Sequence, residues 1–128
     1  MLVLDDEGLS TPAVFRRYDE LHPEPHDPAP VEELINALGS QVLGDLSGLF
    51  VNDLAEPAFT LRTDLAERFN RLDGAGIATV LSGSGPTIGV LCESVEAADA
   101  LAGQLSKEGL RAVRADGPVA GAHIVRSS

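Results

Sequence analysis

The sequence predicts an α+β fold, a ferredoxin-like βαββαβ sandwich with helices inserted after the first strand and an extra strand at the C-terminus. Three observations lead to this prediction. Short apolar, β-branched runs lie near the start, in the middle and near the end of the 128 residues. Two of these runs flank a glycine-rich turn, as the strands of a hairpin do. The stretches between the runs repeat apolar residues every three or four positions, which is the period of an amphipathic helix.

The first 30 residues are predicted to hold one strand, one helix and one loop. Leu2 to Leu4 is the strand, and because the chain enters it directly at its first residue we expect a piece of a longer protein. A hydroxyl residue, Ser10, followed two positions later by a proline predicts a helix start. The apolar stripe of this helix comprises Val14, Phe15, Tyr18 and Leu21. Four prolines then predict an extended loop from His22 to Pro30.

That proline-rich loop also carries side chains of the kind that bind metals. They are His22, Glu24, His26 and Asp27. Nothing in an extended loop fixes such side chains in a coordination geometry, and we therefore expect no metal site there.

Helical spacing continues through the middle of the chain. A short helix is expected over Val31 to Leu38 and is stopped by Gly39, after which Ser40 caps a second helix that reaches Leu46. Further on, Pro57 is expected to open one long helix. Its apolar positions are Ala58, Leu61, Leu65, Phe69 and Leu72, and it ends at Gly74 and Gly76.

The last third of the chain is predicted to complete the sheet. The hairpin strands are Ile77 to Leu81 and Ile88 to Cys92. Ser94 is expected to cap a helix that carries apolar residues on one face and ends at Gly109. The remaining predicted elements are a strand from Arg111 to Ala115, a turn at Gly117-Pro118 and a final strand from Ala122 to Val125.

Composition excludes several classes of function. Hydrophobic residues make up 44% and charged residues 23%, as in a globular domain. The formal charge of −11 repels the phosphate backbone, so no nucleic-acid partner is expected. No run approaches the roughly 20 apolar residues of a membrane span, and we expect a cytoplasmic protein without a membrane partner. Cys92 is the single cysteine, which excludes an intrachain disulfide.

The segment that most suggests a site is the glycine loop, Ser82-Gly83-Ser84-Gly85-Pro86-Thr87. Glycines allow positive φ and expose bare amides, so such a loop can fold around an anion or let another backbone lie against it. It is not a Walker loop, because no Gly-Lys-Ser/Thr follows. A plain hairpin turn explains the same residues, and Asn52 and Asp53 equally fit turn and cap chemistry. The residues alone leave both interpretations open.

Several segments together resemble the C-terminal half of the GHMP kinases, a family named for galactokinase, homoserine, mevalonate and phosphomevalonate kinases. They are residues 81–87, similar to the family's third motif, residues 8–15, the run Asn52-Asp53-Leu54 followed by Pro57, and residues 117–122. Their combination most resembles the branch of the family that phosphorylates an intermediate of the non-mevalonate isoprenoid pathway. The resemblance spans nearly the whole chain.

The resemblance implies that residues 1–128 form the C-terminal domain of such a kinase. The family's catalytic Asp and Lys and its ATP-wrapping motif belong to an N-terminal domain, and no Pro-x-x-x-Gly-Leu-Gly-Ser-Ser run occurs here. No catalytic residue and no metal ligand is therefore expected in this chain. ATP and Mg²⁺ are expected to act in the full-length parent, with neither bound to this part alone.

For the site, the resemblance implies support of the chemistry. Residues 82–87 would press against the phosphate-binding loop across the substrate cleft, with the hydroxyls of Ser84 and Thr87 as added hydrogen-bonding groups. Asn52 and Asp53 would lie behind the site and fix the helix that carries the cleft wall. The implied partners are the missing N-terminal catalytic domain and a small-molecule substrate.

Three further expectations remain beside this interpretation. A surface left bare by the missing domain, including a first strand without a neighbour, predicts a weak, salt-promoted homodimer. The shared glycine loop also fits a GHMP kinase for homoserine or mevalonate. Outside the family, the same fold fits a free-standing ligand-binding module that holds a small anion at the Gly83 loop.

Overall fold

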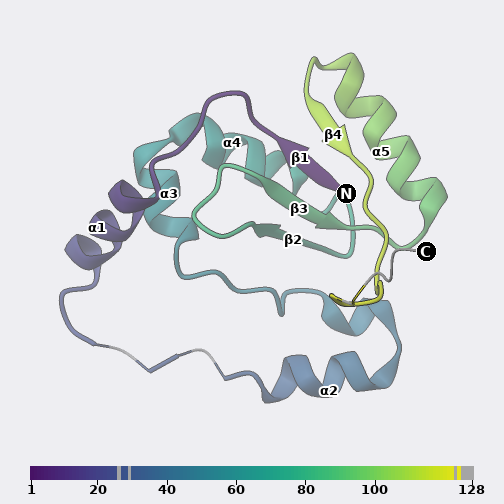
Figure 1. Ribbon diagram of the computed structural model, residues 1–128, viewed down its shortest axis with the longest axis horizontal. Helices are drawn as coiled ribbons and strands as arrows, with labels where there is room; N and C mark the ends of the chain where they lie inside the picture. The colour runs from purple at the N-terminus through teal and green to yellow at the C-terminus, as the bar shows by residue number, and fades with distance from the viewer. Residues whose placement is uncertain (26, 29, 123, 125–128) are drawn as a thin grey trace.

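The computed structural model describes residues 1–25, 27–28, 30–122 and 124 of the chain. Its centre is an antiparallel sheet in the order β2-β3-β1-β4, shown in Figure 1. The strands are β1 (Leu2–Leu4), β2 (Ala78–Leu81), β3 (Ile88–Leu91) and β4 (Arg111–Val113). This order is the one expected of a ferredoxin-like fold and confirms the predicted class.

The expectation that the first strand lacks a neighbour is wrong. β1 is an interior strand, with Val3 paired to Ile88 of β3 on one side and to Ala112 of β4 on the other. The edges of the sheet are β2 and β4. A homodimer formed by strand pairing, which stays a prediction, would use one of these two strands.

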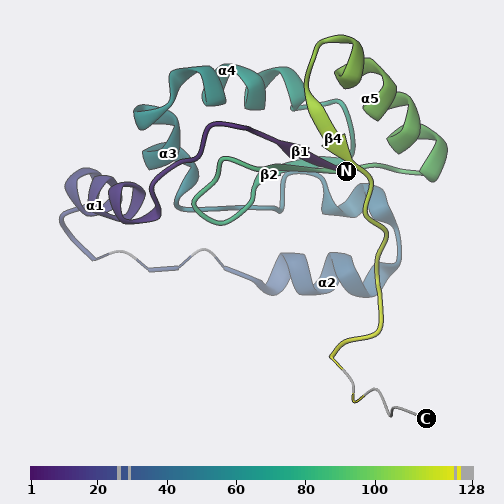
Figure 2. The same cartoon turned by 45° about the horizontal axis from the view of Figure 1, so that its top comes forward.

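Two helices cover one face of the sheet and form the core with it. They are α4 (Thr63–Leu72) and α5 (Val95–Lys107), which lie on the same side in Figure 2. The buried side chains that join them to the strands are Val3, Leu65, Leu72, Leu81, Ile88, Val90, Ala98, Leu101 and Leu105. α5 begins as predicted, because the Ser94 hydroxyl accepts a hydrogen bond from the Ala97 amide at 3.1 Å.

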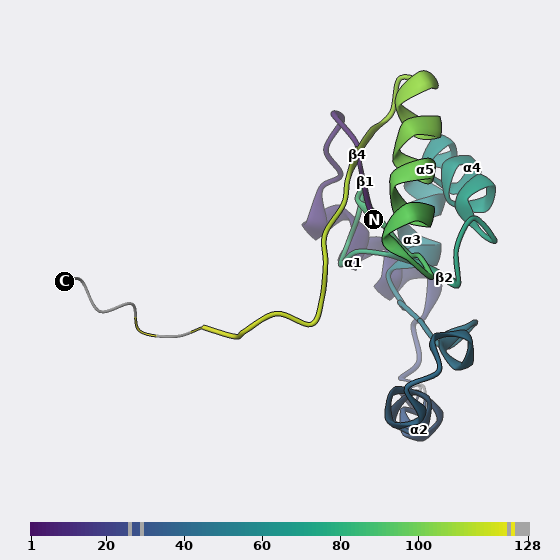
Figure 3. The same ribbon diagram turned by 90° about the vertical axis from the view of Figure 1, so that its right-hand side faces the viewer.

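The other helices are inserted between β1 and β2, as predicted. They are α1 (Thr11–Leu21), α2 (Glu32–Ser40), the 3₁₀ helix η1 (Leu43–Leu46) and α3 (Ala55–Leu61). α1 packs on α3, and Val14 of α1 and Ala58 of α3 are both fully buried. α2 packs on η1 instead and projects away from the sheet, as Figures 1 and 3 show. No helix in the described part of the chain is long and apolar enough to cross a bilayer.

The single long helix predicted after Pro57 is wrong. The chain forms α3 and α4 with a break at Arg62, whose φ of −137° and ψ of 88° lie outside the helical region. The apolar spacing continues across the break, so periodicity alone does not reveal it. The break turns Leu61, one of the predicted core positions, towards solvent, where it is 42% exposed.

The predicted stop at Gly39 is also wrong. α2 continues through Ser40 and ends where Gln41 takes up a left-handed conformation, with φ of 60°. Ser40 completes this helix instead of starting the next one. Its hydroxyl donates to the Ala37 carbonyl at 2.8 Å and accepts from the Val42 amide at 3.1 Å.

The extra C-terminal strand is contradicted as far as the structure describes it. Ala122 and Ile124 lie outside any strand, while residues 123 and 125 of the predicted range lie outside the described residues. A strand needs a paired edge and a buried face. Val119 and Ile124 are 78% and 91% exposed, and the chain after β4 runs away from the sheet in Figure 3.

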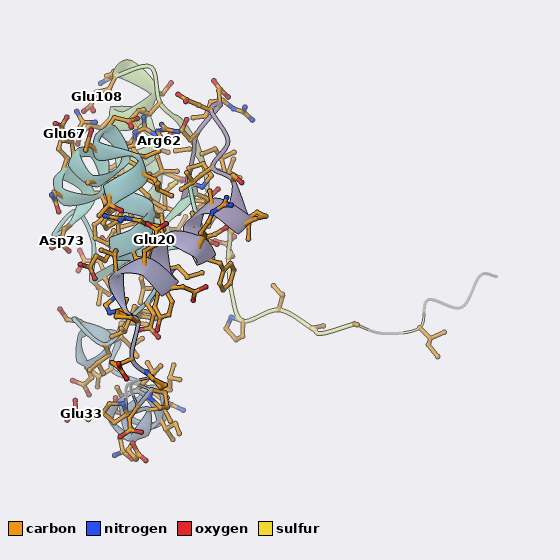
Figure 4. All side chains as sticks on the ribbon, turned by 90° about the vertical axis from the view of Figure 1, so that its left-hand side faces the viewer. Glu20, Glu33, Arg62, Glu67, Asp73 and Glu108 are labelled. Carbon is orange, nitrogen blue, oxygen red and sulfur yellow. The ribbon has the colours of Figure 1, made fainter. Side chains whose placement is uncertain are left out.

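A charged network ties the end of β1 to the helix break. The Arg62 guanidinium donates to Asp5 at 3.1 Å, to Asp64 at 2.7 and 2.6 Å and to the Glu7 carbonyl at 3.2 Å. Arg68 also donates to Asp5, whose side chain is only 8% exposed. Figure 4 shows Arg62 within the body of the domain, whereas Glu33 lies on the projecting α2. The network holds the Arg62 side chain at the point where the chain leaves the helix.

Acid is expected to weaken the fold through this network. Burial raises the pKa of Asp5. The hydrogen bonds and charges of the Glu7 amide, Arg68 and Arg62 lower it by more, so the pKa lies below its ordinary value of 3.8. The hydrogen bond from Arg62 lowers the pKa of Asp64 from 3.8 to about 2. A carboxyl with a depressed folded-state pKa stabilises the fold above its unfolded pKa, and this stabilisation is lost as pH falls through the folded value.

The test is the urea midpoint of unfolding at about pH 5 and about pH 2.5. We expect a lower midpoint at the acidic value and a smaller decrease in Asp5→Asn, which lacks the titrating group. Equal decreases in the two proteins would show that other carboxyls cause the acid sensitivity.

Candidate functional site

The glycine loop, residues 82–87, connects β2 to β3 as the hairpin prediction requires. Leu81 and Ile88 pair at its base. Within it, the Ser82 amide donates to the Thr87 carbonyl at 2.8 Å and the Gly85 amide to the Ser82 carbonyl at 2.9 Å. Gly83 and Gly85 have φ values of 56° and 82°, the left-handed region that favours glycine. The two glycines are therefore required by the backbone of the loop.

Asn52 holds this loop from outside. Its side-chain amide donates to the carbonyls of Leu81 and Gly83, each at 2.7 Å. Its side-chain oxygen accepts the Leu54 amide at 2.9 Å, at the start of α3. Asn52, which lies 29 and 31 residues before these two carbonyls, thus joins the loop to the start of α3.

The N-terminus of α1 meets the loop from another direction. The hydroxyls of Thr11 and Ser84 lie 2.7 Å apart and share a hydrogen bond. Phe15 stands one turn after Thr11, on the same side of the helix. Thr11, which contacts the loop, and Phe15, which lines the neighbouring pocket, therefore lie on the same face of α1.

That pocket has a volume of about 670 Å³ and lies between α1, the start of α2 and the segment before α3. Its lining is mostly apolar and includes Phe15, Tyr18, Val31, Phe50, Val51 and Asn52. Phe15 is 52% exposed and Val51 is 65% exposed. Large apolar side chains that stay accessible around a concave surface are typical of a ligand site.

The structure brings most of the predicted site residues together. Ser82 to Thr87 form one loop, and Asn52 lies directly behind it. Asp53 is exposed and lines the pocket, so it does not share the position of Asn52. The sequence did not predict Thr11, Phe15, Tyr18 or Phe50 as site residues. Val14 and Phe15, both in the predicted apolar stripe, point roughly 100° apart around the helix; Val14 is buried, and Phe15 is 52% exposed.

The chemistry available at the loop is hydrogen bonding without charge. No residue from Ser82 to Thr87 is ionisable, and the pocket beside it carries the carboxylates of Asp19 and Asp53. Across the described residues, no three His, Cys, Asp or Glu side chains are grouped so that they could bind a metal. His26, one of the four side chains considered in the proline-rich loop, lies outside the described residues. The loop can therefore position a ligand through uncharged hydrogen bonds, and the charged groups beside it are the carboxylates of Asp19 and Asp53.

Comparison with known proteins identifies relatives of the chain. The family described as "GHMP kinases C terminal" matches residues 20–111. Proteins named 4-diphosphocytidyl-2-C-methyl-D-erythritol kinase align with the chain from Nocardioides sp. at 41% identity over 98% of the chain, and from Arthrobacter sp. at 40% over 98%. The protein of that name from Corynebacterium diphtheriae is 41% identical over 96% of the chain.

These alignments cover only part of the relatives. The chain spans 43% of the Nocardioides protein, 41% of the Arthrobacter protein and 39% of the Corynebacterium protein. The family match, in contrast, covers every element from α2 to α5, together with the glycine loop. The chain therefore belongs to the GHMP kinase family, as its C-terminal domain.

Proposed function

We propose that this chain is the C-terminal, substrate-cleft half of an ATP-dependent kinase that phosphorylates 4-diphosphocytidyl-2-C-methyl-D-erythritol in non-mevalonate isoprenoid synthesis. The observation that carries the proposal is the 41% identity over 98% of the chain to a protein of that name. Two other proteins of this name align at 40% and 41% identity. Family membership also argues against a free-standing ligand-binding module.

The geometry supports a positioning role in phosphoryl transfer. This reaction is catalysed mainly by holding the groups in line and stabilising the charge that develops. The glycine loop presents a backbone without large side chains, so a phosphate-binding segment of the remaining protein can approach closely. The hydroxyls of Ser84 and Thr87 add hydrogen-bonding capacity. The apolar pocket beside the loop accommodates the part of a small substrate that does not react.

The charged chemistry is assigned to the longer protein. ATP supplies the transferred phosphoryl group, but the glycine loop carries no Lys or Arg to offset its charge. Under this proposal ATP and Mg²⁺ bind to an N-terminal catalytic domain, which is the expected partner of this chain in the cytoplasm.

The 128-residue chain alone is expected to transfer no phosphate from ATP. The test compares it with the polypeptide that joins it to its N-terminal domain, in a coupled assay with 4-diphosphocytidyl-2-C-methyl-D-erythritol as acceptor. The longer protein is expected to turn over at a rate ordinary for kinases, on the order of 1–100 s⁻¹. Homoserine and mevalonate serve as the competing acceptors.

Two results would contradict the proposal. Turnover by the 128-residue chain that survives further purification would place catalytic groups in this half. Preferential phosphorylation of homoserine or mevalonate by the longer protein would keep the family and overturn the substrate.

A further inference from the structure

We infer that Asn52 is the residue that positions the glycine loop against the pocket for the reaction proposed above. The inference rests on that proposed function only for its catalytic consequence. The positioning itself follows from contacts within this chain. Asn52 is thus assigned to the loop, in addition to the start of α3 where the sequence placed its role.

The loop has little to hold it in place apart from Asn52. Its internal backbone bonds are those of the Ser82 and Gly85 amides. Two of its six residues are glycines at positive φ, and glycine backbones have the largest conformational freedom to lose. A glycine loop that keeps one conformation needs restraints from outside. The Asn52 amide supplies one at the Gly83 carbonyl and a second at the carbonyl of Leu81, the last residue of β2 before the loop.

The orientation of the Asn52 amide is fully determined. Its two N–H groups face two carbonyl oxygens, while its oxygen faces the Leu54 amide. Rotating the amide by half a turn would leave oxygen against oxygen and N–H against N–H. Every polar atom of the side chain is therefore committed. A carboxylate of the same shape cannot replace it, because it has no hydrogen to donate to either carbonyl.

Asn52 also connects the loop to the rest of the site. It lines the pocket together with Phe15 and Phe50. The second connection between loop and pocket wall is the bond of Ser84 to Thr11 on α1. Losing the Asn52 restraint leaves the loop attached on the α1 side alone, so its distance to a ligand in the pocket is no longer fixed. Misplacement of a positioning group lowers the rate of the chemical step more than it lowers substrate binding.

The first test uses the 128-residue chain and needs no activity. Asn52→Asp keeps the shape of the side chain and removes both donors, and Asn36→Asp makes the same chemical change at an exposed position of α2. Amide hydrogen exchange measured by NMR at Ser82 and Gly85 is expected to accelerate about tenfold or more in Asn52→Asp. The strand amide of Val90, which donates to the Met1 carbonyl, is expected to exchange as in the wild type.

Asn52→Ala is measured in parallel, because it removes the donors without adding charge and remains informative if Asn52→Asp does not fold. Exchange at Ser82 and Gly85 within about twofold of the wild type in a folded variant overturns the inference. Acceleration in Asn36→Asp as well would also overturn it, since the effect would then come from charge alone.

The second test uses the longer protein with its N-terminal domain. Asn52→Asp is expected to lower kcat by roughly 10- to 100-fold while KM for the acceptor changes by less than about threefold. A roughly 10- to 100-fold rise in KM with kcat unchanged overturns the positioning role. If the wild-type longer protein phosphorylates none of the acceptors, the proposed function fails, whereas the exchange measurement still decides whether Asn52 holds the loop.

Discussion

Replacing Gly85 by valine is expected to destabilise the 128-residue chain by about 1–3 kcal/mol and to abolish phosphate transfer by the longer protein. Gly85 has a φ of 82°, where a β-branched residue is strained. A Cβ at this position would also lie 3.2 Å from Leu81 Cδ1 and 3.6 Å from Leu65 Cδ2. Leu65 is fully buried, so the added side chain disturbs both the loop and the core beneath it.

Two further glycines give matched comparisons for this prediction. Gly83 has a φ of 56° but open space around its Cβ position, so Gly83→Val is expected to lose transfer activity with a smaller loss of stability. Gly103 lies inside α5 with open space and no positive φ, and Gly103→Val is expected to leave the urea midpoint nearly unchanged. A Gly85→Val chain as stable as Gly103→Val would contradict the required left-handed conformation. Full transfer activity in both loop variants would remove the loop from the site.

The elements predicted correctly are those whose signals are local. The hairpin follows from two β-rich runs around glycines, and α5 from a serine cap, an apolar face and Gly109, whose φ is 78°. Such signals act within one turn of helix or one hairpin, so the sequence displays them directly. The helix break at Arg62 was missed because its cause is distant. Arg62 bonds to Asp5, which lies 57 residues earlier.

The site divides in the same way. The glycine loop is recognisable in the sequence because positive φ demands glycine. The pocket is not, because its walls come from α1 and from the segment before α3, which only the fold brings together. Asn52 stands between these cases. Asparagine is a common turn residue, and the predicted turn role is met by its bond to the Leu54 amide. Its bonds to the Leu81 and Gly83 carbonyls, 29 and 31 residues later, depend on how the chain packs.

Replacing Asp5 by alanine is expected to cost roughly 3 kcal/mol of unfolding free energy. The Asp5 carboxylate is 8% exposed and receives hydrogen bonds from Arg62 and Arg68, whose side chains are 12% and 19% exposed. Removing one partner of a buried ion pair leaves the other charge buried and unpaired. The resulting loss of unfolding free energy is larger than the net contribution of the intact pair. Arg62 retains its bond to Asp64, whereas the bond of Arg68 within this network is the one to Asp5.

Asp6 supplies the matched control, since it is the next residue and also bonds an arginine. Asp6 and Arg111 lie 2.8 Å apart, but their side chains are 80% and 67% exposed. An exposed pair contributes about 0–1 kcal/mol because water and salt screen it, so Asp6→Ala is expected to leave the urea midpoint close to that of the wild type. Equal midpoints for Asp5→Ala and Asp6→Ala would show that the buried network does not stabilise the junction of β1 with α3 and α4. A large difference would show that burial, and not the number of ion pairs, determines how strongly β1 is held to the helices that carry the site.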